Sequence, residues 1–162
     1  MHYVCLLAPL MLMMSVQAQS PKQKSTRFSH QLSTKASAET IWQIWTEVDE
    51  WHQWDKGLQK ASLHDPWQIG AKGTLRSLEN RKVKFTVTEF EPGKSYTFKS
   101  NLPLGGLYVK RSLERQGDQV LFTHEVWFQG LTKGIFARLL GKDFQAMLPQ
   151  VMENIKVIAE AP

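Results

Sequence analysis

Four polar side chains stand at equivalent positions in four neighbouring segments of alternating polar and apolar residues. They are Glu89, Tyr96, Arg111 and His124. Each stands where the alternation otherwise has an apolar residue, so we expect each to point to the buried face of a β-strand. A guanidinium, a phenol and an imidazole in an apolar interior would bind the polar end of a ligand. An imidazole beside a carboxylate would also transfer protons.

The turns between these segments predict which residues face one another. Pro92-Gly93 and Gly117-Asp118 suit the central positions of tight hairpin turns, because Pro fixes φ and Gly accepts a positive φ. With these turns and a loop at 102–105, each polar side chain falls opposite the next, as register requires. The result is a polar row, Glu89–Tyr96–Arg111–His124, followed by an apolar row, Val87–Phe98–Val109–Val126.

Three interpretations of the polar row remain open. A buried Arg111 needs a carboxylate, a carbonyl group or a polar ligand, because an unpaired charge is costly in an apolar interior. Glu89 is its expected internal partner, so the row is either a ligand-binding group or a self-satisfied structural network. In the third interpretation His124 is a general base tuned by Glu89. The chain has no Gly-x-Ser-x-Gly elbow, so we assign no catalytic residue and favour a binding protein over an enzyme.

Aromatic and sulfur-containing side chains in two other segments extend the candidate site. Trp45, Trp51 and Trp54 would either contact an apolar ligand at a pocket mouth or pack in the core. Phe144 and Met147 lie at helical spacing near the C-terminus, where they would form an adaptable pocket wall or plain core.

Metal and nucleotide sites are not indicated by the sequence. The histidines are widely spaced, there is no His-x-x-x-His or Cys pair, and neither a phosphate loop nor a dinucleotide fingerprint occurs. We therefore expect no metal and no cofactor.

The order of elements predicts an α+β helix-grip fold. A strand at 27–35 precedes two short helices, which begin after Ser37 as N-cap and end near Trp54. Six further strands follow, giving a sheet of about seven, and an apolar helical stripe runs from 132 to 159. A curved antiparallel sheet wrapped around this long C-terminal helix buries both apolar faces and leaves room for a cavity between them.

The first 18 residues predict a signal peptide. An uncharged apolar run ends in Val16-Gln-Ala18, which suits cleavage before Gln19, although Met1-His-Tyr lacks a basic residue. The alternative is an uncleaved membrane tether. Residues 19–25 would be a flexible lead and residues 26–160 a single domain. We expect a periplasmic or secreted protein, and the only cysteine, Cys5, lies within the signal sequence.

The net charge of +5 allows two interpretations. Basic residues cluster at 22–27, 81–84 and 110–111, which favours either weak contact with an anionic membrane surface or a plain solvated surface. No Lys/Arg block reaches the length of a polybasic patch, which favours the solvated surface. We expect no nucleic-acid partner. We expect a monomer.

Several stretches resemble one known superfamily. "ASAETIWQIWTEVDEWHQW" (36–54), "VTEFEPGKSYTF" (87–98) and "LLGKDFQAMLPQVMENIKVIAE" (139–160) are similar to segments of the SRPBCC (START/Bet v 1-like) superfamily. The resemblance is to its polyketide cyclase/dehydrase-like members and extends over about residues 26–160. It implies the helix-grip fold. It leaves function open, since the superfamily includes cyclases, lipid and hormone carriers and coenzyme Q-binding proteins.

The sequence therefore predicts an exported bacterial protein that holds a small, mostly apolar ligand between sheet and terminal helix. The ligand would be a lipid, an isoprenoid or an aromatic compound. The alternatives are a cyclase/dehydratase-type enzyme using His124 and Glu89, and an envelope interaction module without a ligand. The predicted ligand-binding residues are Glu89, Tyr96, Phe98, Val109, Arg111, His124, Val126, Trp45, Trp51, Trp54, Phe144 and Met147.

Overall fold

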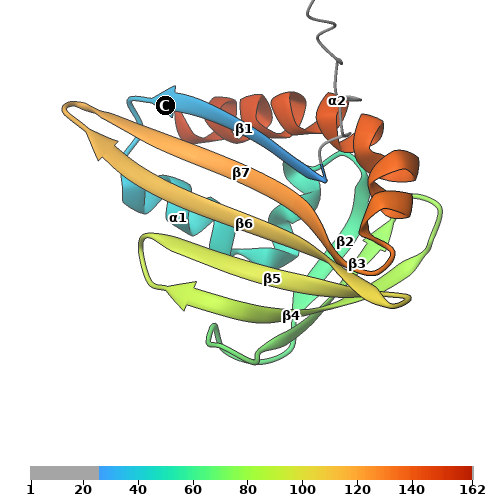
Figure 1. Cartoon of the computed structure of the whole chain (residues 1–162). Helices are drawn as coiled ribbons and strands as arrows, with labels where there is room; N and C mark the ends of the chain where they lie inside the picture. Colours follow the sequence, from blue (N-terminus) through green and yellow to red (C-terminus); the bar gives the residue numbers. More distant parts are fainter. Residues whose placement is uncertain (1–25, 162) are drawn as a thin grey trace, which may run out of the picture.

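A computed structural model describes residues 26–161 as a seven-stranded antiparallel sheet with helices on one side of it (Figure 1). The predicted signal peptide and lead lie outside the described residues. The strand order across the sheet is β1-β7-β6-β5-β4-β3-β2. The strands are β1 (Arg27–Thr34), β2 (Leu58–Leu63), β3 (Lys72–Ser77), β4 (Lys82–Glu91), β5 (Ser95–Leu102), β6 (Gly105–Gln116) and β7 (Gln119–Gly130).

Two short helices follow β1, as predicted. The helix α1 (Ala38–Thr46) begins at Ser37, whose side chain accepts a hydrogen bond from the Thr40 amide at 3.0 Å. This bond satisfies one of the amides that a helix leaves unpaired at its start. A 3₁₀ helix, η1 (Val48–Gln53), continues the chain toward β2. The two helices carry three tryptophans beneath the sheet.

Two of the three hairpins have the predicted register. In β6–β7, Arg111 lies opposite His124, and the turn holds Gly117 at φ +61°. In β5–β6, Tyr96 lies opposite Arg111. The predicted row Tyr96–Arg111–His124 is therefore confirmed across three strands.

The third hairpin differs from the prediction and removes Glu89 from the row. The loop after Glu91 contains three residues, because Glu91 pairs with Ser95 and not with Lys94. A β-bulge at Thr88 then restores the register, so that Val87 still faces Phe98. Between these two irregularities the strand is out of phase by one residue, and Glu89 pairs with Thr97 on the outer face of the sheet.

The C-terminal helix α2 (Lys133–Ala159) lies along the edge strand β1 and the adjacent β7 (Figure 1). Gly141 allows a close approach, because a Cβ there would come within 2.5 Å of the Phe28 ring of β1. The helix continues through Pro149, which has no amide hydrogen to donate to the carbonyl of Gln145. In the described part of the chain, no helix has the length and apolar character that crossing a bilayer would require.

The core is concentrated beneath the second half of α2. Trp45, Met152 and Ile155 have no exposed surface, and they pack with the aromatic side chains of η1 and the central strands. The amide of Asn154 donates to the carbonyl of Trp54 at 2.9 Å, which ties α2 to the segment after η1. The first half of α2 covers a cavity instead.

Candidate ligand site

A cavity of about 370 Å³ lies between the sheet and the first half of α2. Its walls come from strands β2 to β7, from η1 and the segment that joins it to β2, and from α2. The apolar lining residues are Trp51, Leu58, Leu75, Val83, Phe98, Leu107, Val109, Val126, Leu140, Phe144 and Met147. The volume lies within the range of about 300–1,000 Å³ that is usual for small-molecule sites.

The Arg111 guanidinium is enclosed by aromatic rings at the inner wall of the cavity. Its Cζ atom lies 4.3 Å from the Trp51 ring centroid and 4.6 Å from that of Trp54. Tyr96 and Phe98 lie farther away, at 5.6 Å and 5.8 Å. Cation–π contacts of this length are attractive, and more so without solvent. Aromatic rings therefore contact the flat faces of the guanidinium, and the N–H groups at its edges remain available for hydrogen bonding.

One of those N–H groups is used. Nη1 of Arg111 donates to the Tyr96 hydroxyl, which in turn donates to the carbonyl of Trp45 at 3.0 Å. Burial raises the pKa of Tyr96 to about 12, with the nearby Arg111 opposing that shift, so the phenol stays neutral. The same carbonyl accepts a bond from the Trp51 indole, also at 3.0 Å. It belongs to the last turn of α1, which leaves its carbonyls without helical partners.

Arg111 forms no ion pair within residues 26–161. The residue is 2% exposed, its Nε has no hydrogen-bond partner, and no carboxylate forms an ion pair with it. Glu89, the predicted partner, is on the outer face, where it accepts from Thr97 and pairs with Lys110. These two contacts lower the pKa of Glu89. The register prediction was therefore wrong for Glu89, and the cavity wall carries a positive charge that no ion pair neutralises.

His124 stands next to Arg111 as a neutral imidazole. Its Nδ1 atom is buried and has no partner among the described residues. Burial, and secondarily the Arg111 charge, holds the pKa of His124 well below its usual range. The imidazole is therefore uncharged at neutral pH and has an unused polar atom.

Asp55, which the sequence analysis did not select, also lines the cavity. It is half-buried and accepts a hydrogen bond from the Gly57 amide at 3.0 Å. Burial raises the pKa of this carboxyl, while the Gly57 amide and the Arg111 charge lower it to a smaller extent. The signal available in the sequence was its position, because it is a carboxylate that directly follows the tryptophans of the η1 segment and precedes strand β2.

The family model for polyketide cyclase/dehydrase and lipid transport proteins matches residues 25–160. The chain belongs to this family. The comparison with curated protein sequences found no match.

Several solved structures have a similar fold. The di-domain ARO/CYC StfQ of the steffimycin biosynthetic pathway is 11% identical, with a TM-score of 0.67 over 83% of this chain and 50% of that chain. The present chain thus spans half of that protein. Truncated norcoclaurine synthase from Thalictrum flavum is 12% identical, with a TM-score of 0.65 over 84% and 94% of the two chains.

A Helicobacter pylori hypothetical protein, jhp0584, is also similar. It is 12% identical, with a TM-score of 0.70 over 92% of this chain and 100% of that chain. At such identities the likeness concerns the fold alone.

Within this family fold, the structure separates the predicted site residues into two groups. Eight of them line the cavity: Trp51, Phe98, Val109, Arg111, His124, Val126, Phe144 and Met147. Four do not line it. Glu89 is on the outer face of the sheet, and Trp45 is buried in the core. Tyr96 and Trp54 contact Arg111 on the side away from the cavity. The lining residues that were not predicted are Asp55, Gly57, Leu58, Leu75, Ser77, Arg81, Val83, Ser100, Leu107, Leu140 and Asp143.

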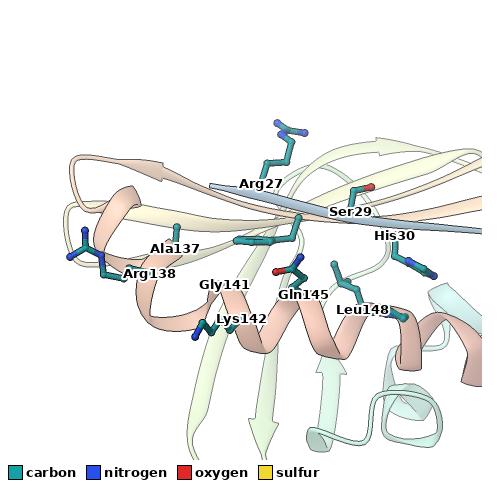
Figure 2. Close-up of a pocket in the computed structure, with 11 residues that line it drawn as sticks. Arg27, Ser29, His30, Ala137, Arg138, Gly141, Lys142, Gln145 and Leu148 are labelled. Atoms are coloured by element: carbon teal, nitrogen blue, oxygen red, sulfur yellow. The ribbon is translucent and has the colours of Figure 1, made fainter. Parts of the chain in front are cut away.

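Larger hollows on the surface lack comparable chemistry. One of about 720 Å³ lies between β1 and α2 (Figure 2). Figure 2 shows Arg27 and Ser29 pointing away from the helix and Gln145 pointing toward the strand. No buried polar atom without a partner lies among the described residues that line it. Residues 26–161 also contain no group of three or more His, Cys, Asp or Glu side chains placed to hold a metal ion.

Proposed function

We propose that this member of the family binds a small, mostly apolar molecule with an anionic head group. The head group lies against Arg111, and the apolar part lies between the sheet and the first half of α2. The observation that carries this proposal is the buried Arg111 guanidinium, with an unpartnered Nε and no ion pair, in the wall of an otherwise largely apolar cavity. A lipid acid, an isoprenoid acid or an aromatic acid fits this description.

The electrostatics favour an anion over a neutral polar group. A buried cation without a counter-charge is costly, and an anionic ligand removes that cost on binding. A hydrogen bond to a charged group contributes about 1.5–3 kcal/mol, which corresponds to roughly ten- to a hundredfold in affinity. The neutral His124 imidazole offers a further hydrogen bond without cancelling the positive charge. The site should therefore distinguish an acid from the matching alcohol.

The apolar walls fit a variable hydrocarbon part. Phe144 and Met147 of α2 face β-strand residues across the cavity, and methionine adapts readily to different ligand shapes. Leu140 and Val83 lie nearer the surface, and Val83 is 41% exposed. This arrangement supports recognition of a head group of defined charge together with tolerance in the tail.

The setting that we propose is the bacterial cell envelope. The apolar run in residues 4–14 and the cleavage pattern before Gln19 support export through a cleaved signal peptide. The excess of basic residues supports weak contact with anionic membrane surfaces. We propose that the protein acts as a monomer.

Two measurements test the ligand proposal. Native mass spectrometry of the protein purified from its own host should show a bound apolar acid. After delipidation, dansyl-aminoundecanoic acid should bind at least tenfold more tightly than the corresponding dansyl alcohol. Arg111→Met should abolish this difference, whereas Arg115→Met, an exposed arginine on the same strand, should retain it. Equal binding of acid and alcohol by the unmodified protein would refute the proposal.

Polyketide cyclase-type chemistry is a second candidate. The observation in its favour is that a neutral imidazole, His124, and a carboxyl of raised pKa, Asp55, line the same cavity. Acid–base chemistry on a bound ketone would use this pair, and Glu89 would have no part in it. Turnover of a poly-β-ketone that His124→Gln removes without unfolding the protein would favour this candidate. The interaction module without a ligand requires a filled core, which does not fit the cavity.

A further inference from the structure

Most of the exposed large apolar side chains gather around the opening of the cavity. Eight such residues occur among the described residues, and six belong to three segments at this end of the molecule. Leu78 and Val83 are in the β3–β4 hairpin, and Leu104 is in the β5–β6 turn. Leu131 lies just before α2, and Ile135 and Leu139 lie in its first turns. We call these six residues the mouth patch: Leu78, Val83, Leu104, Leu131, Ile135 and Leu139.

Hydrogen bonds join two of these three segments, and the third shares a cavity wall with the helix. The Leu131 amide donates to the carbonyl of Leu104 at 3.0 Å, and the Thr132 hydroxyl donates to the carbonyl of Pro103 at 2.6 Å. Val83 and Leu140, from the hairpin and the helix, line the same cavity. Figure 1 shows the β3–β4 hairpin, the β5–β6 turn and the first turns of α2 at the right-hand end of the sheet. The mouth patch is therefore one end of the domain.

Leu104 is exposed in an unfavourable backbone conformation. Its φ is +54°, in the left-handed region that large side chains seldom adopt, and 72% of its surface is exposed. Glycine or asparagine would fit this turn position more readily. Both the backbone conformation and the exposure of an apolar side chain to water are unfavourable here, which indicates that Leu104 has a role at the surface.

The charge around the mouth patch is strongly positive. Residues 78–84 and 131–143 contain six Lys or Arg and two Asp or Glu. One of the two acids, Glu79, already pairs with Arg81. The remaining basic side chains around the opening, which include Lys133, Arg138 and Lys142, therefore complement an anionic surface.

We propose that the mouth patch docks on an anionic lipid bilayer, with its apolar side chains at the boundary between head groups and acyl chains. Apolar side chains that protrude from separate turns, each beside basic residues, match the layered polarity of a membrane surface. A bilayer in this position would face the cavity opening. The inference rests on the proposed function only in naming the bilayer as the source of the apolar ligand.

Local fluorescent probes test the docking, because the apolar residues 4–14 would make total vesicle binding of the full chain uninformative. Cys5→Ser removes the only cysteine, and Leu131→Cys or Leu139→Cys then carries an NBD label. Ile69→Cys and Val157→Cys are matched controls, since both are similarly exposed and lie outside the patch. With phosphatidylglycerol/phosphatidylethanolamine vesicles, NBD at 131 and 139 should shift to the blue and become at least threefold less quenched by acrylamide.

The electrostatic part is tested by charge removal. The triple variant Lys133→Gln/Arg138→Gln/Lys142→Gln should need at least ten times more lipid to reach half of the fluorescence change at position 131. The triple variant Lys35→Gln/Lys94→Gln/Lys110→Gln, which loses the same charge elsewhere, should leave it nearly unchanged. An equal response at Ile69, no response at Leu131, or a patch-dependent dimer without vesicle contact overturns the docking. Binding of dansyl-aminoundecanoic acid in solution, measured separately, reports on the cavity and shows whether only one of the two proposals has failed.

Discussion

The two halves of α2 pack against different surroundings although they continue one apolar stripe. In the second half, Leu148, Met152 and Ile155 are fully buried against the aromatic core. In the first half, Phe144 and Met147 border the cavity, and Leu139 is 65% exposed. One amphipathic helix thus serves as core at one end and as cavity wall at the other.

The difference comes from what lies beneath the helix. The helix α1 and the end of η1 place Trp45 and Trp54 under the second half, and Asn154 bonds directly to the carbonyl of Trp54. Under the first half this layer only borders the space with Trp51 and Asp55, and the strands face α2 across an open cavity. The apolar stripe of the helix therefore does not distinguish core from cavity. The tryptophan side chains that pack beneath one half of it do.

Two methionines on α2 provide the largest expected contrast. Met152→Ala should lower the free energy of unfolding by about 2–5 kcal/mol, because it opens a new void in a packed core. Met147→Ala should lower it by about 1 kcal/mol or less, since Met147 already borders a cavity. Urea midpoints at an unchanged m-value measure both changes. Equal losses would show that the two ends are packed alike.

Arg111→Met should stabilise the ligand-free protein while it removes the preference for acids. Replacing a buried charge that forms no ion pair by an apolar side chain of similar length is expected to raise the free energy of unfolding by about 1–3 kcal/mol. Thermal or urea unfolding of the delipidated variant measures this change. A less stable variant would mean that the aromatic rings and Tyr96 compensate the charge without a ligand.

His124 should make the protein less stable as the solution becomes acidic. Its folded-state pKa is lowered, so below the unfolded value of about 6.5 the unfolded chain binds a proton that the folded chain does not. The free energy of unfolding should then fall by up to about 1.4 kcal/mol for each pH unit between pH 6.5 and 5. His124→Gln should remove this slope, and a slope that persists unchanged in the variant would assign it to other groups.

Glu89→Gln should have the smallest effect. The side chain is on the outer face, paired with Lys110, so we expect a stability change within about 0.5 kcal/mol and unchanged binding of dansyl-aminoundecanoic acid. A loss of acid binding above threefold would place this carboxylate at the cavity after all. The matched measurement is the same titration on Arg111→Met.

The fold and most of the central strands could be predicted because turn residues and alternation agreed. Gly117-Asp118 fixed the β6–β7 register, and Tyr96 lies opposite Arg111 as expected. The β4–β5 hairpin failed because two single-residue irregularities compensate each other, so the apolar pattern on both sides of them stayed consistent. Phe90 was the available signal: it is apolar, pairs with Tyr96 and packs on Trp42 and Trp67.

The division between cavity and core could not be predicted from residue types. Trp45, Trp51 and Trp54 lie within ten residues of one another, yet they are respectively core, cavity wall and the support of a guanidinium. Which of these environments a tryptophan meets depends on strands far along the chain. Asp55 was missed for the same reason, because Arg111 and the residues of α2 that line the cavity with it lie far along the chain.

The bulge at Thr88 has a consequence for the charge of the cavity. Thr88 and the third loop residue, Lys94, each add one residue, and together they keep Glu89 outside. In a hairpin of the same length without the bulge, Glu91 would pair with Lys94 across a two-residue Pro92-Gly93 turn, and Glu89 would lie opposite Tyr96 on the inner face. Arg111 would then have a carboxylate on its own face of the sheet. A slip of one residue within this hairpin, with no substitution and no change of length, would thus convert a binding site for acids into a neutral one.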